Sequence, residues 1–343
     1  MTCDLNQIDA MFAELKNAPQ FLHPSNTWAC LNRTNLAQLK LQGLENIRNT
    51  VACNYFTFTG DQTQLRFLKS NVSKFVYLIN KLRTKIALQN PFVRRYLKNK
   101  ELPDDFLEKH TYYTQMLCDY VKKIDHLHLI HKVRDSKLGN PPPIYRWGKL
   151  LTADLYNSLI EYYSIMNGIQ KKELHEVIEI GAGYGRNASV FLQLHENIRY
   201  IICDIPPALY VSQSYLTQRF PDKKVFCFRP FQNYQDIRKE WEGSHICFIL
   251  PHQLPLLPDK KTDLVINISS FHEMRTDQIK YYFEQIDRLI KGHFYLKQWK
   301  TSFLPEDNLT IHEDDYPELP KWKRLYSRTC EVQTKFFERL YEI

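Results

Sequence analysis

One stretch of the chain is more informative than any other: Val177-Ile178-Glu179-Ile180-Gly181-Ala182-Gly183-Tyr184-Gly185-Arg186. Its first four residues form a short, mostly apolar run typical of a buried strand, and a helix is expected from about Asn187. Three of the ten glycines of the 343-residue chain fall within five residues here. Because glycine has no Cβ, such a turn lets the backbone bend sharply and approach a ligand closely. The stretch therefore predicts a strand, a ligand-binding turn and a helix.

The spacing of the glycines separates two classes of cofactor. A dinucleotide fingerprint has the pattern G-x-G-x-x-G and places a pyrophosphate at the helix N-terminus. Here the third glycine, Gly185, comes one residue early, and Glu179 lies two residues before the first. Asp204 ends the next apolar run, where its carboxylate can accept hydrogen bonds from both hydroxyls of a ribose. The pattern predicts S-adenosylmethionine, which has no phosphate, with Glu179 near its amino group. It disfavours an NAD-dependent dehydrogenase, and a tight turn in another α/β protein is the remaining alternative.

Short apolar runs alternate with helical patterns on both sides of this stretch. Strands are expected over 177–180, 200–203, 225–228, 246–250, 264–268 and 293–298, and a final pair over 324–332 and 336–343. A helix is expected to run from Thr276 as N-cap to Gly292 as C-cap. This alternation predicts an α/β protein with a doubly wound, largely parallel sheet.

The first 140 residues carry a different pattern. Helical spacing of apolar residues is found over 36–47, 75–88 and 112–121, with an aromatic run over 54–58. The three prolines of Gly139-Asn140-Pro141-Pro142-Pro143 cannot continue a helix. We therefore divide the chain into a mostly helical N-terminal domain, residues 1–140, for acceptor binding or oligomerisation, and a cofactor-binding domain, residues 141–343. Within the latter, residues 151–166 are expected to form an amphipathic helix.

The groups expected to take part in a reaction follow the strand at 264–268. In an open α/β sheet, ligands bind beyond the carboxyl ends of the strands, so Ser269, His272 and Glu273 are expected close to the reacting atoms. Histidine has a pKa near neutrality, which makes His272 a candidate general base, with Glu273 orienting its ring or binding a divalent ion. A pocket-lining or helix-capping role for His272 is the alternative. His252 and Gln253 follow another strand and are expected to border the cofactor or the acceptor.

Five segments together resemble the sugar O-methyltransferases of bacterial polysaccharide and antibiotic gene clusters. They are the glycine-rich stretch 179–186, Cys203-Asp204-Ile205-Pro206-Pro207-Ala208-Leu209, Leu250-Pro251-His252-Gln253-Leu254, Ile268-Ser269-Ser270-Phe271-His272-Glu273-Met274 and the segment 294–300. The resemblance covers about residues 154–300. It implies a Rossmann-like class I methyltransferase sheet, S-adenosylmethionine as donor and a sugar hydroxyl as acceptor. Some such enzymes also need magnesium, for which Glu273 is the obvious candidate ligand.

The residues expected to bind the cofactor follow from these motifs. They are Glu179, Gly181, Ala182, Gly183, Gly185, Arg186, Asp204, Ile205, His252, Gln253 and Ser269. The acceptor implied by the resemblance is a sugar, nucleotide-linked or part of a glycan.

Composition limits the remaining alternatives. The net charge of +8 admits an anionic acceptor, including RNA, but no RNA-binding module precedes the core. A catalytically silent partner protein with the same fold is the second alternative, and a homo-oligomer is compatible with either. The eight cysteines include no CxxC pair, and neither a secretory signal nor an apolar run of membrane-spanning length is found. These features predict a cytoplasmic protein.

Overall fold

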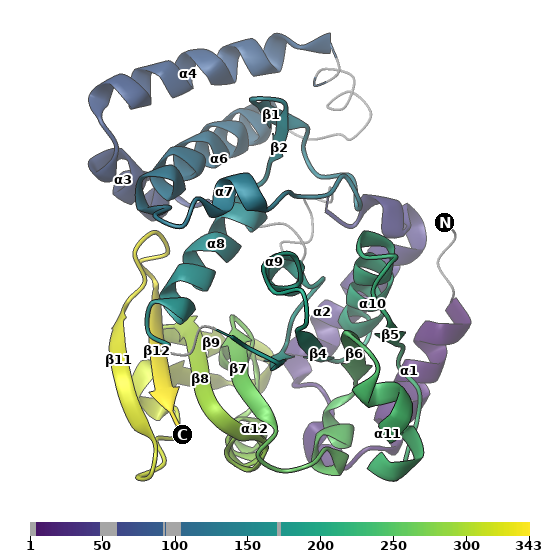
Figure 1. Ribbon diagram of the computed structural model, residues 1–343. Helices are drawn as coiled ribbons and strands as arrows, with labels where there is room; N and C mark the ends of the chain where they lie inside the picture. Colours follow the sequence, from purple (N-terminus) through teal and green to yellow (C-terminus); the bar gives the residue numbers. More distant parts are fainter. Residues whose placement is uncertain (1–4, 49–59, 92, 94–103, 170–172) are drawn as a thin grey trace.

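A single eight-stranded sheet forms the centre of the computed structural model, which describes residues 5–48, 60–91, 93, 104–169 and 173–343 (Figure 1). The strand order is β11-β12-β8-β7-β3-β4-β6-β5. Strands β3 to β8 are parallel, and β12 runs antiparallel to its neighbours β8 and β11. The bounds are β3 Glu176–Ile180, β4 Arg199–Cys203, β5 Val225–Phe226, β6 Ile246–Ile249, β7 Thr262–Ile268, β8 Ile290–Trp299, β11 Lys323–Thr329 and β12 Phe336–Glu342. The expected Rossmann-like α/β class is confirmed.

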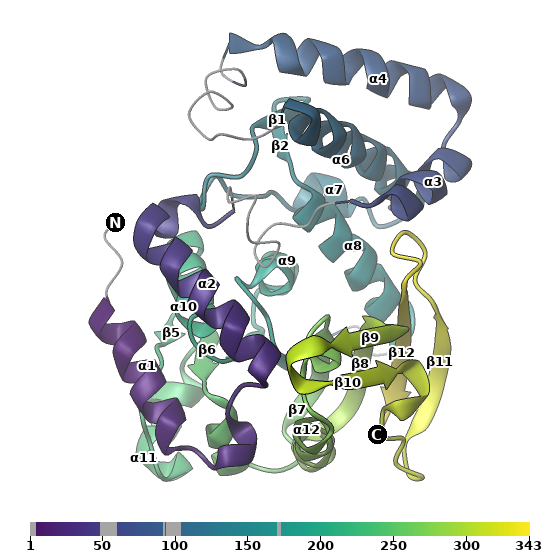
Figure 2. The same cartoon turned by 180° about the vertical axis from the view of Figure 1, so that it is seen from behind.

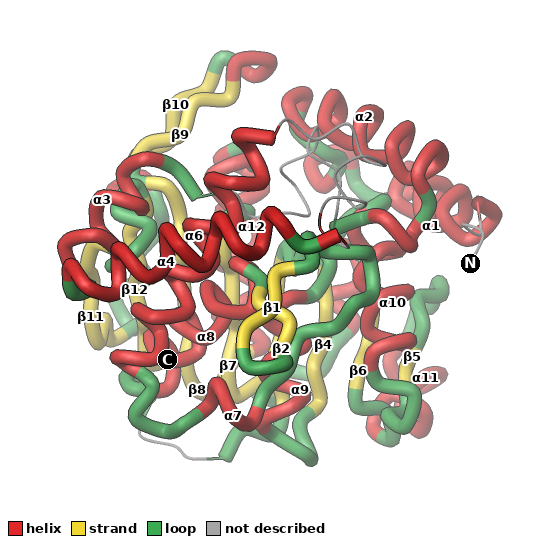
Figure 3. The backbone as a smooth tube through the Cα atoms, turned by 90° about the horizontal axis from the view of Figure 1, so that it is seen from above, coloured by secondary structure: helices red, strands yellow, loops and turns green. Residues whose placement is uncertain are grey.

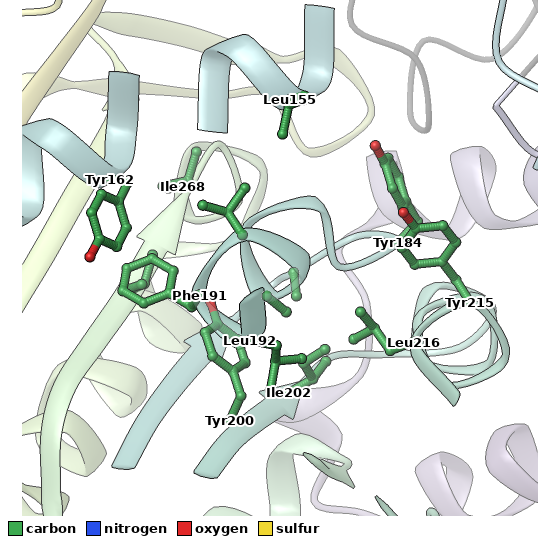
Figure 4. Close-up of a cluster of buried hydrophobic side chains, with 14 of the residues drawn as sticks. Leu155, Tyr162, Tyr184, Phe191, Leu192, Tyr200, Ile202, Tyr215, Leu216 and Ile268 are labelled. Atoms are coloured by element: carbon green, nitrogen blue, oxygen red, sulfur yellow. The ribbon is translucent and has the colours of Figure 1, made fainter. Parts of the chain in front are cut away.

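Helices cover both faces of this sheet. The bounds of those that follow β3 are α9 Arg186–Leu194, α10 Ala208–Arg219, α11 Tyr234–Glu242 and α12 Thr276–Leu289. Successive strand residues point to opposite faces, so Val177 joins one buried cluster with α9 and α10, and Ile178 joins another with α11 and α12. Figure 4 shows part of the first cluster, where Phe191 of α9 lies between Tyr162 and Tyr200. Burial on both faces explains the continuous apolar runs of the parallel strands.

The helix after β7 differs from its expected bounds at both ends. It begins with Thr276 itself, and the residue before it, Arg275, donates its backbone N–H to Oε1 of Gln278. It ends at Leu289, and Gly292 lies inside β8 rather than at a C-cap. A Cβ atom on Gly292 would lie 2.2 Å from the backbone oxygen of Asp263. This glycine therefore permits close approach of β8 to β7.

The N-terminal part is mostly helical, as its pattern predicts. The elements before β3 are α1 Leu5–Asn17, α2 Asn26–Gln42, α3 Gln62–Asn71, α4 Lys74–Gln89, α6 Asp104–Ile124, α7 Leu129–Lys132, the hairpin β1 Ile144–Arg146 and β2 Lys149–Leu151, and α8 Ala153–Met166. The aromatic run 54–58 lies outside the described residues. One buried cluster has members on both sides of residue 140, among them Met11, Leu117 and Leu159. The division at residue 140 stays a prediction, since the described residues share this core.

Helix α8, where the sequence predicts an amphipathic helix, is buried on nearly every side. It lies between α6 and the rest of the sheet domain in both views of the molecule (Figures 1 and 2). Twelve of its fourteen residues are buried, including Asp154, Ser158 and Glu161. Its polar residues therefore face the interior. Within the described residues, no helix combines the length and the apolar character that a membrane crossing requires.

Candidate active site

The glycine-rich turn lies at the carboxyl end of β3 and contains three residues with positive φ. Gly181, Gly183 and Gly185 have φ angles of 72°, 61° and 87°. A Cβ atom on Gly181 would lie 2.1 Å from Oγ of Ser270, whereas nothing lies within 4 Å of a Cβ built on Gly183. The turn is thus closely packed at its start and open at its centre. Gly185 then leads into α9.

Asp204 joins this turn to the end of β4. Its Oδ2 atom accepts the backbone N–H of Gly183 at 3.0 Å, and its Oδ1 atom accepts that of Ile205 at 2.8 Å. Burial raises the pKa of Asp204 to about 7, against the effect of these two hydrogen bonds. Each oxygen keeps a further lone pair, so the carboxylate can still accept hydrogen bonds from a ligand.

Glu179 lies one strand away, inside β3. Its carboxylate accepts hydrogen bonds from the hydroxyl of Tyr200 at 2.7 Å and from Nδ2 of Asn187 at 3.2 Å. Burial raises its pKa to about 7 despite these two bonds and the nearby charge of Arg186. Two carboxyl groups with raised pKa values therefore stand on neighbouring strands beside the turn.

A cavity of about 430 Å³ opens over the turn. It lies at the carboxyl end of β3, which pairs with β4 on one side and with β7 on the other. The strand order reverses here, and open α/β sheets bind ligands at such a topological switch point. Its volume is within the range of about 300–1,000 Å³ typical of small-molecule sites. Nine of the thirteen residues expected at the site line it: Glu179, Gly181, Ala182, Gly183, Arg186, Asp204, Ile205, Ser269 and Glu273.

Buried ion pairs form one wall of this cavity. The carboxylate of Glu161, on α8, accepts Nζ of Lys297 at 2.7 Å and both terminal nitrogens of Arg186, at 2.5 and 3.0 Å. Although burial opposes it, these two cations lower the pKa of Glu161 to about 2. Arg186 therefore lines the cavity while its positive charge is already paired with the carboxylate of Glu161.

A second buried network joins the N-terminal part to the turn. Arg48 is buried and makes paired hydrogen bonds to Asp135, at 2.9 and 2.7 Å. Its Nη2 atom lies 3.6 Å from Asp154, which accepts the hydroxyl of Tyr184 at 2.8 Å. Tyr184 belongs to the glycine-rich turn, and the guanidinium carbon of Arg48 lies 5.1 Å from the centre of its ring. The conformation of the turn is therefore held in part by residue 48.

Helix α2 forms the roof of the cavity. Trp28, Leu31, Thr34 and Asn35 line it from above, and in Figure 2 the helix runs toward the β9–β10 hairpin, Thr301–Leu304 and Leu309–His312. The hairpin loop caps the helix, because the carboxylate of Asp307 accepts the first two backbone N–H groups of α2, each at 2.9 Å. At the same end, Ser25 donates its hydroxyl to the backbone oxygen of Glu273 at 3.0 Å.

The two residues expected at the reaction end occupy different positions. Glu273 lines the cavity, but His272 is 4% exposed and lies behind it, packed on Trp299 and Phe336. The Nδ1 atom of His272 lies 2.9 Å from Oε1 of Gln298, which also accepts the backbone N–H of His272. Nδ1 therefore carries the hydrogen, and Nε2 faces Oε1 of Glu273 at 3.6 Å. Of the two side chains, Glu273 therefore reaches the cavity and His272 does not, and their catalytic roles stay predictions.

His252 and Gln253 do not reach the cavity, which corrects their expected place at the cofactor. Gln253 is fully buried, and its side chain binds the backbone of Leu250 and Arg229. His252 lies in a separate depression and contacts Glu14 at 3.2 Å. The reason is local: at the start of the 3₁₀ turn after β6, the side chain of Gln253 accepts the backbone N–H of Leu250. Gly185 does not line the cavity either, since a Cβ there would meet Leu216 at 2.8 Å.

Several lining residues escape motif analysis. Asp154 and Glu161 line the cavity and, with Ser158, recur at helical spacing in a mostly apolar segment, a pattern that indicates a buried polar face. Trp28 and Asn35 carry no comparable signal. In the part of the chain that the structure describes, no three histidine, cysteine, aspartate or glutamate side chains are grouped as metal ligands. The expectation of magnesium at Glu273 is therefore unsupported.

No family model and no curated protein match this chain. Solved structures are similar to about half of it. The PH0226 protein of Pyrococcus horikoshii OT3 is 16% identical over 55% of this chain and 90% of its own, with a TM-score of 0.38. The 1,6-didemethyltoxoflavin-N1-methyltransferase of Burkholderia thailandensis is 15% identical over 55% and 78%, also with a TM-score of 0.38. A SAM dependent methyltransferase from Aquifex aeolicus is 15% identical over 54% and 91%, with a TM-score of 0.35. At such values function does not transfer from one protein to another.

Proposed function

We propose that this protein is an S-adenosylmethionine-dependent methyltransferase that methylates a hydroxyl group of a sugar. The observation that carries the proposal is Asp204, whose carboxylate lies at the end of β4, lines the cavity and accepts the backbone N–H of Gly183 at the open centre of the glycine-rich turn. An acid in this position suits the two hydroxyls of a ribose.

The charge of the cavity favours this cofactor over a dinucleotide. Its lining includes five acidic residues and one basic residue: Asp154, Glu161, Glu179, Asp204 and Glu273 against Arg186. Glu161 is paired with Lys297 and Arg186, and Asp154 lies near Arg48. Glu179, Asp204 and Glu273 therefore supply the remaining acidic groups. Such a lining suits the sulfonium and ammonium groups of S-adenosylmethionine better than a pyrophosphate. The same argument disfavours a nucleotide-linked or otherwise anionic sugar and favours an uncharged one.

The residues fit the parts of this cofactor. Asp204 would accept the ribose hydroxyls, Glu179 would face the ammonium group, and the exposed side of Arg186 would take the carboxylate of the amino acid tail. When bound, the cofactor supplies an electrophilic methyl group on its sulfonium sulfur. Trp28, on the roof, offers an aromatic face against which the apolar face of a sugar ring can pack.

We assign the proton transfer to the pair Glu273 and His272. The carboxylate of Glu273 would accept the proton of the acceptor hydroxyl as that hydroxyl takes the methyl group of the bound donor. His272 would position the side chain of Glu273 by packing beside it, with its Nε2 atom 3.6 Å from the carboxylate. General base catalysis of this kind contributes about 10²–10⁴-fold to a rate.

Calorimetric titration with S-adenosylmethionine tests the cofactor assignment. Asp204→Ala removes the acceptor of two charge-assisted hydrogen bonds, and we expect binding weaker by about 10²-fold. Asp222→Ala, at an exposed position between α10 and β5, is the matched control and should bind like the native protein. Equal affinity in all three proteins would remove Asp204 from the cofactor site.

Transfer of a labelled methyl group identifies the acceptor. Neutral oligosaccharides, nucleotide sugars and RNA are offered separately, with and without EDTA. We expect label in the neutral sugars, independent of EDTA. Label in RNA would instead favour the RNA methyltransferase alternative, and cofactor binding with no transfer to any fraction would favour a silent partner protein.

A further inference from the structure

Helix α4 turns a stripe of apolar residues outward. Its buried residues, Asn80 and Thr84, are polar, and Tyr77 also packs against the protein, on Tyr112. The residues turned outward are large and apolar, with exposed fractions of 72% for Phe75, 61% for Leu78, 59% for Leu82 and 59% for Ile86. Their spacing of three and four residues places them in one stripe along the helix. A surface helix normally has the opposite arrangement.

Polar contacts hold α4 in this orientation. Nδ2 of Asn80 donates to Oδ2 of Asp119, on α6, at 2.8 Å, and Arg83 donates to Oδ1 of Asn80 at 3.1 Å. Asp119 also pairs with Arg146, of the β1–β2 hairpin, at 2.8 Å. Turning the apolar stripe inward would bury it against α6 at the cost of this network. The outward stripe is therefore built into the packing.

The helix also occupies an outlying position in the fold. In Figures 1 and 2, two opposite views, α4 is the outermost element at its end of the molecule, and α6 separates it from α8. Figure 3 looks down on that end and shows α4 lying lengthwise across it. The stripe is thus carried on the outermost described helix at that end of the molecule.

The charges beside the stripe all have one sign. The segment from Gln62 to Gln89, which comprises α3 and α4, contains no aspartate or glutamate. Its basic residues are Arg66, Lys69, Lys74, Lys81, Arg83 and Lys85. Of these, Lys74, Lys81 and Lys85 are exposed on α4. A partner for this surface must combine an apolar layer with negative charge.

We propose that α4 docks the protein onto the surface of an anionic lipid bilayer. The four apolar side chains would enter the boundary between headgroups and acyl chains, and the lysines would reach the lipid phosphates. A second copy of this chain fits less well, because pairing α4 with α4 would bring two acid-free, basic segments together. A protein partner would have to enclose this outermost helix in an acidic groove. This inference does not depend on the reaction proposed above.

Vesicle flotation of the full chain tests the proposal. The probes are vesicles of phosphatidylcholine alone and of phosphatidylcholine mixed with phosphatidylglycerol in equal amounts. We expect flotation with the mixed vesicles only, weakened by salt. Leu78→Ser combined with Leu82→Ser should reduce binding about tenfold or more, because two side chains no longer enter the boundary. Lys81→Gln and Lys85→Gln should each reduce it about fivefold.

The matched control is Phe303→Ser, which removes a side chain that is 60% exposed on β9. It should float like the native protein, and circular dichroism confirms that each variant is folded. Absence of flotation in the native protein, or equal flotation of the leucine variant, overturns the proposal. So does a concentration-dependent dimer in light scattering that the leucine variant abolishes, since a second copy would then occupy the stripe.

Discussion

The backbone N–H of Gly183 donates to Oδ2 of Asp204 at 3.0 Å, so that the turn after β3 and the end of β4 are held as one unit. Gly183 can make this contact because it has a φ of 61° and no side chain. The acid proposed to bind the ribose is therefore positioned by the glycine-rich turn itself. The glycine-rich turn and Asp204 therefore depend on each other for their positions.

Cofactor affinity should rise with pH. Asp204 and Glu179 have pKa values of about 7 because both are buried, so each is partly protonated near neutrality. Each must lose its proton to accept hydrogen bonds from a hydroxyl or an ammonium group. We expect affinity for S-adenosylmethionine to increase between about pH 6 and pH 8, with release of protons on binding. Calorimetry in two buffers of different ionisation enthalpy measures that release, and proton uptake would contradict the assignment.

Glu179→Gln should stabilise the ligand-free protein at alkaline pH. Burial raises the pKa of Glu179 to about 7 in the folded state, above the ordinary value of about 4.3 for a glutamate. Between these values the folded state holds a proton that the unfolded state has lost, so stability from this group falls as pH rises. A neutral glutamine lacks this effect. We expect a free energy of unfolding higher by about 1–3 kcal/mol at pH 8 and little changed at pH 5.

Urea denaturation at both pH values measures this difference. Glu284→Gln, an exposed substitution on α12, is the control and should leave the unfolding free energy unchanged at either pH. A destabilised Glu179→Gln protein at pH 8 would show that the carboxylate is needed for packing around Tyr200 and Asn187.

Glu273→Gln should lower turnover without changing cofactor affinity. Glu273 faces the cavity, and its amide analogue cannot accept a proton, so we expect kcat to fall by about 10²–10⁴-fold. His272→Ala should lower kcat less, because His272 acts through Glu273. Kinetics with a saturating acceptor and calorimetry with S-adenosylmethionine separate the two effects. Full activity of Glu273→Gln would exclude it as the base.

Asp307→Ala should weaken acceptor binding although Asp307 does not line the cavity. Its carboxylate caps α2 through the backbone N–H groups of Asn26 and Thr27, and loss of such a cap costs about 1 kcal/mol. We expect a higher KM for the acceptor and an unchanged dissociation constant for S-adenosylmethionine. Glu306→Ala removes only a contact with the hydroxyl of Thr27 and is the matched control. Equal KM values in both variants would show that the cap does not set the position of the roof.

The parts of the site that could be predicted from sequence are those encoded locally. The strand from 177 to 180, the glycine turn and the acid at 204 lie within 28 residues, and each follows from side-chain period or backbone freedom. The final antiparallel pair is also predictable, since two short segments flank a short connection, although only the second, 336–343, is largely apolar. The parallel direction of the remaining strands follows from their alternation with helices.

The rest depends on contacts between distant parts of the chain. The roof helix is capped by Asp307, which lies 281 residues from Asn26 along the chain. The ring of His272 is turned away from the cavity by Gln298, on another strand, and no local pattern indicates this. The helical period over 75–88 is present, but it does not say which face packs inward. The hydrogen bond from Asn80 to Asp119 holds the face of α4 that carries Asn80 inward.

The roof has a consequence for any attempt to shorten the protein. A fragment that starts at residue 141 would retain all eight strands of the central sheet and the glycine turn, yet it would lose Trp28 and Asn35 above the cavity and Arg48 behind the turn. Its cavity would become an open trough, with water reaching the acceptor hydroxyl and with Asp154 no longer paired to Arg48. Such a fragment would also lose the contact of Arg48 with Tyr184 of the turn and part of a shared buried core. Excision of the N-terminal helices should therefore weaken methyl donor binding as well as abolish methyl transfer.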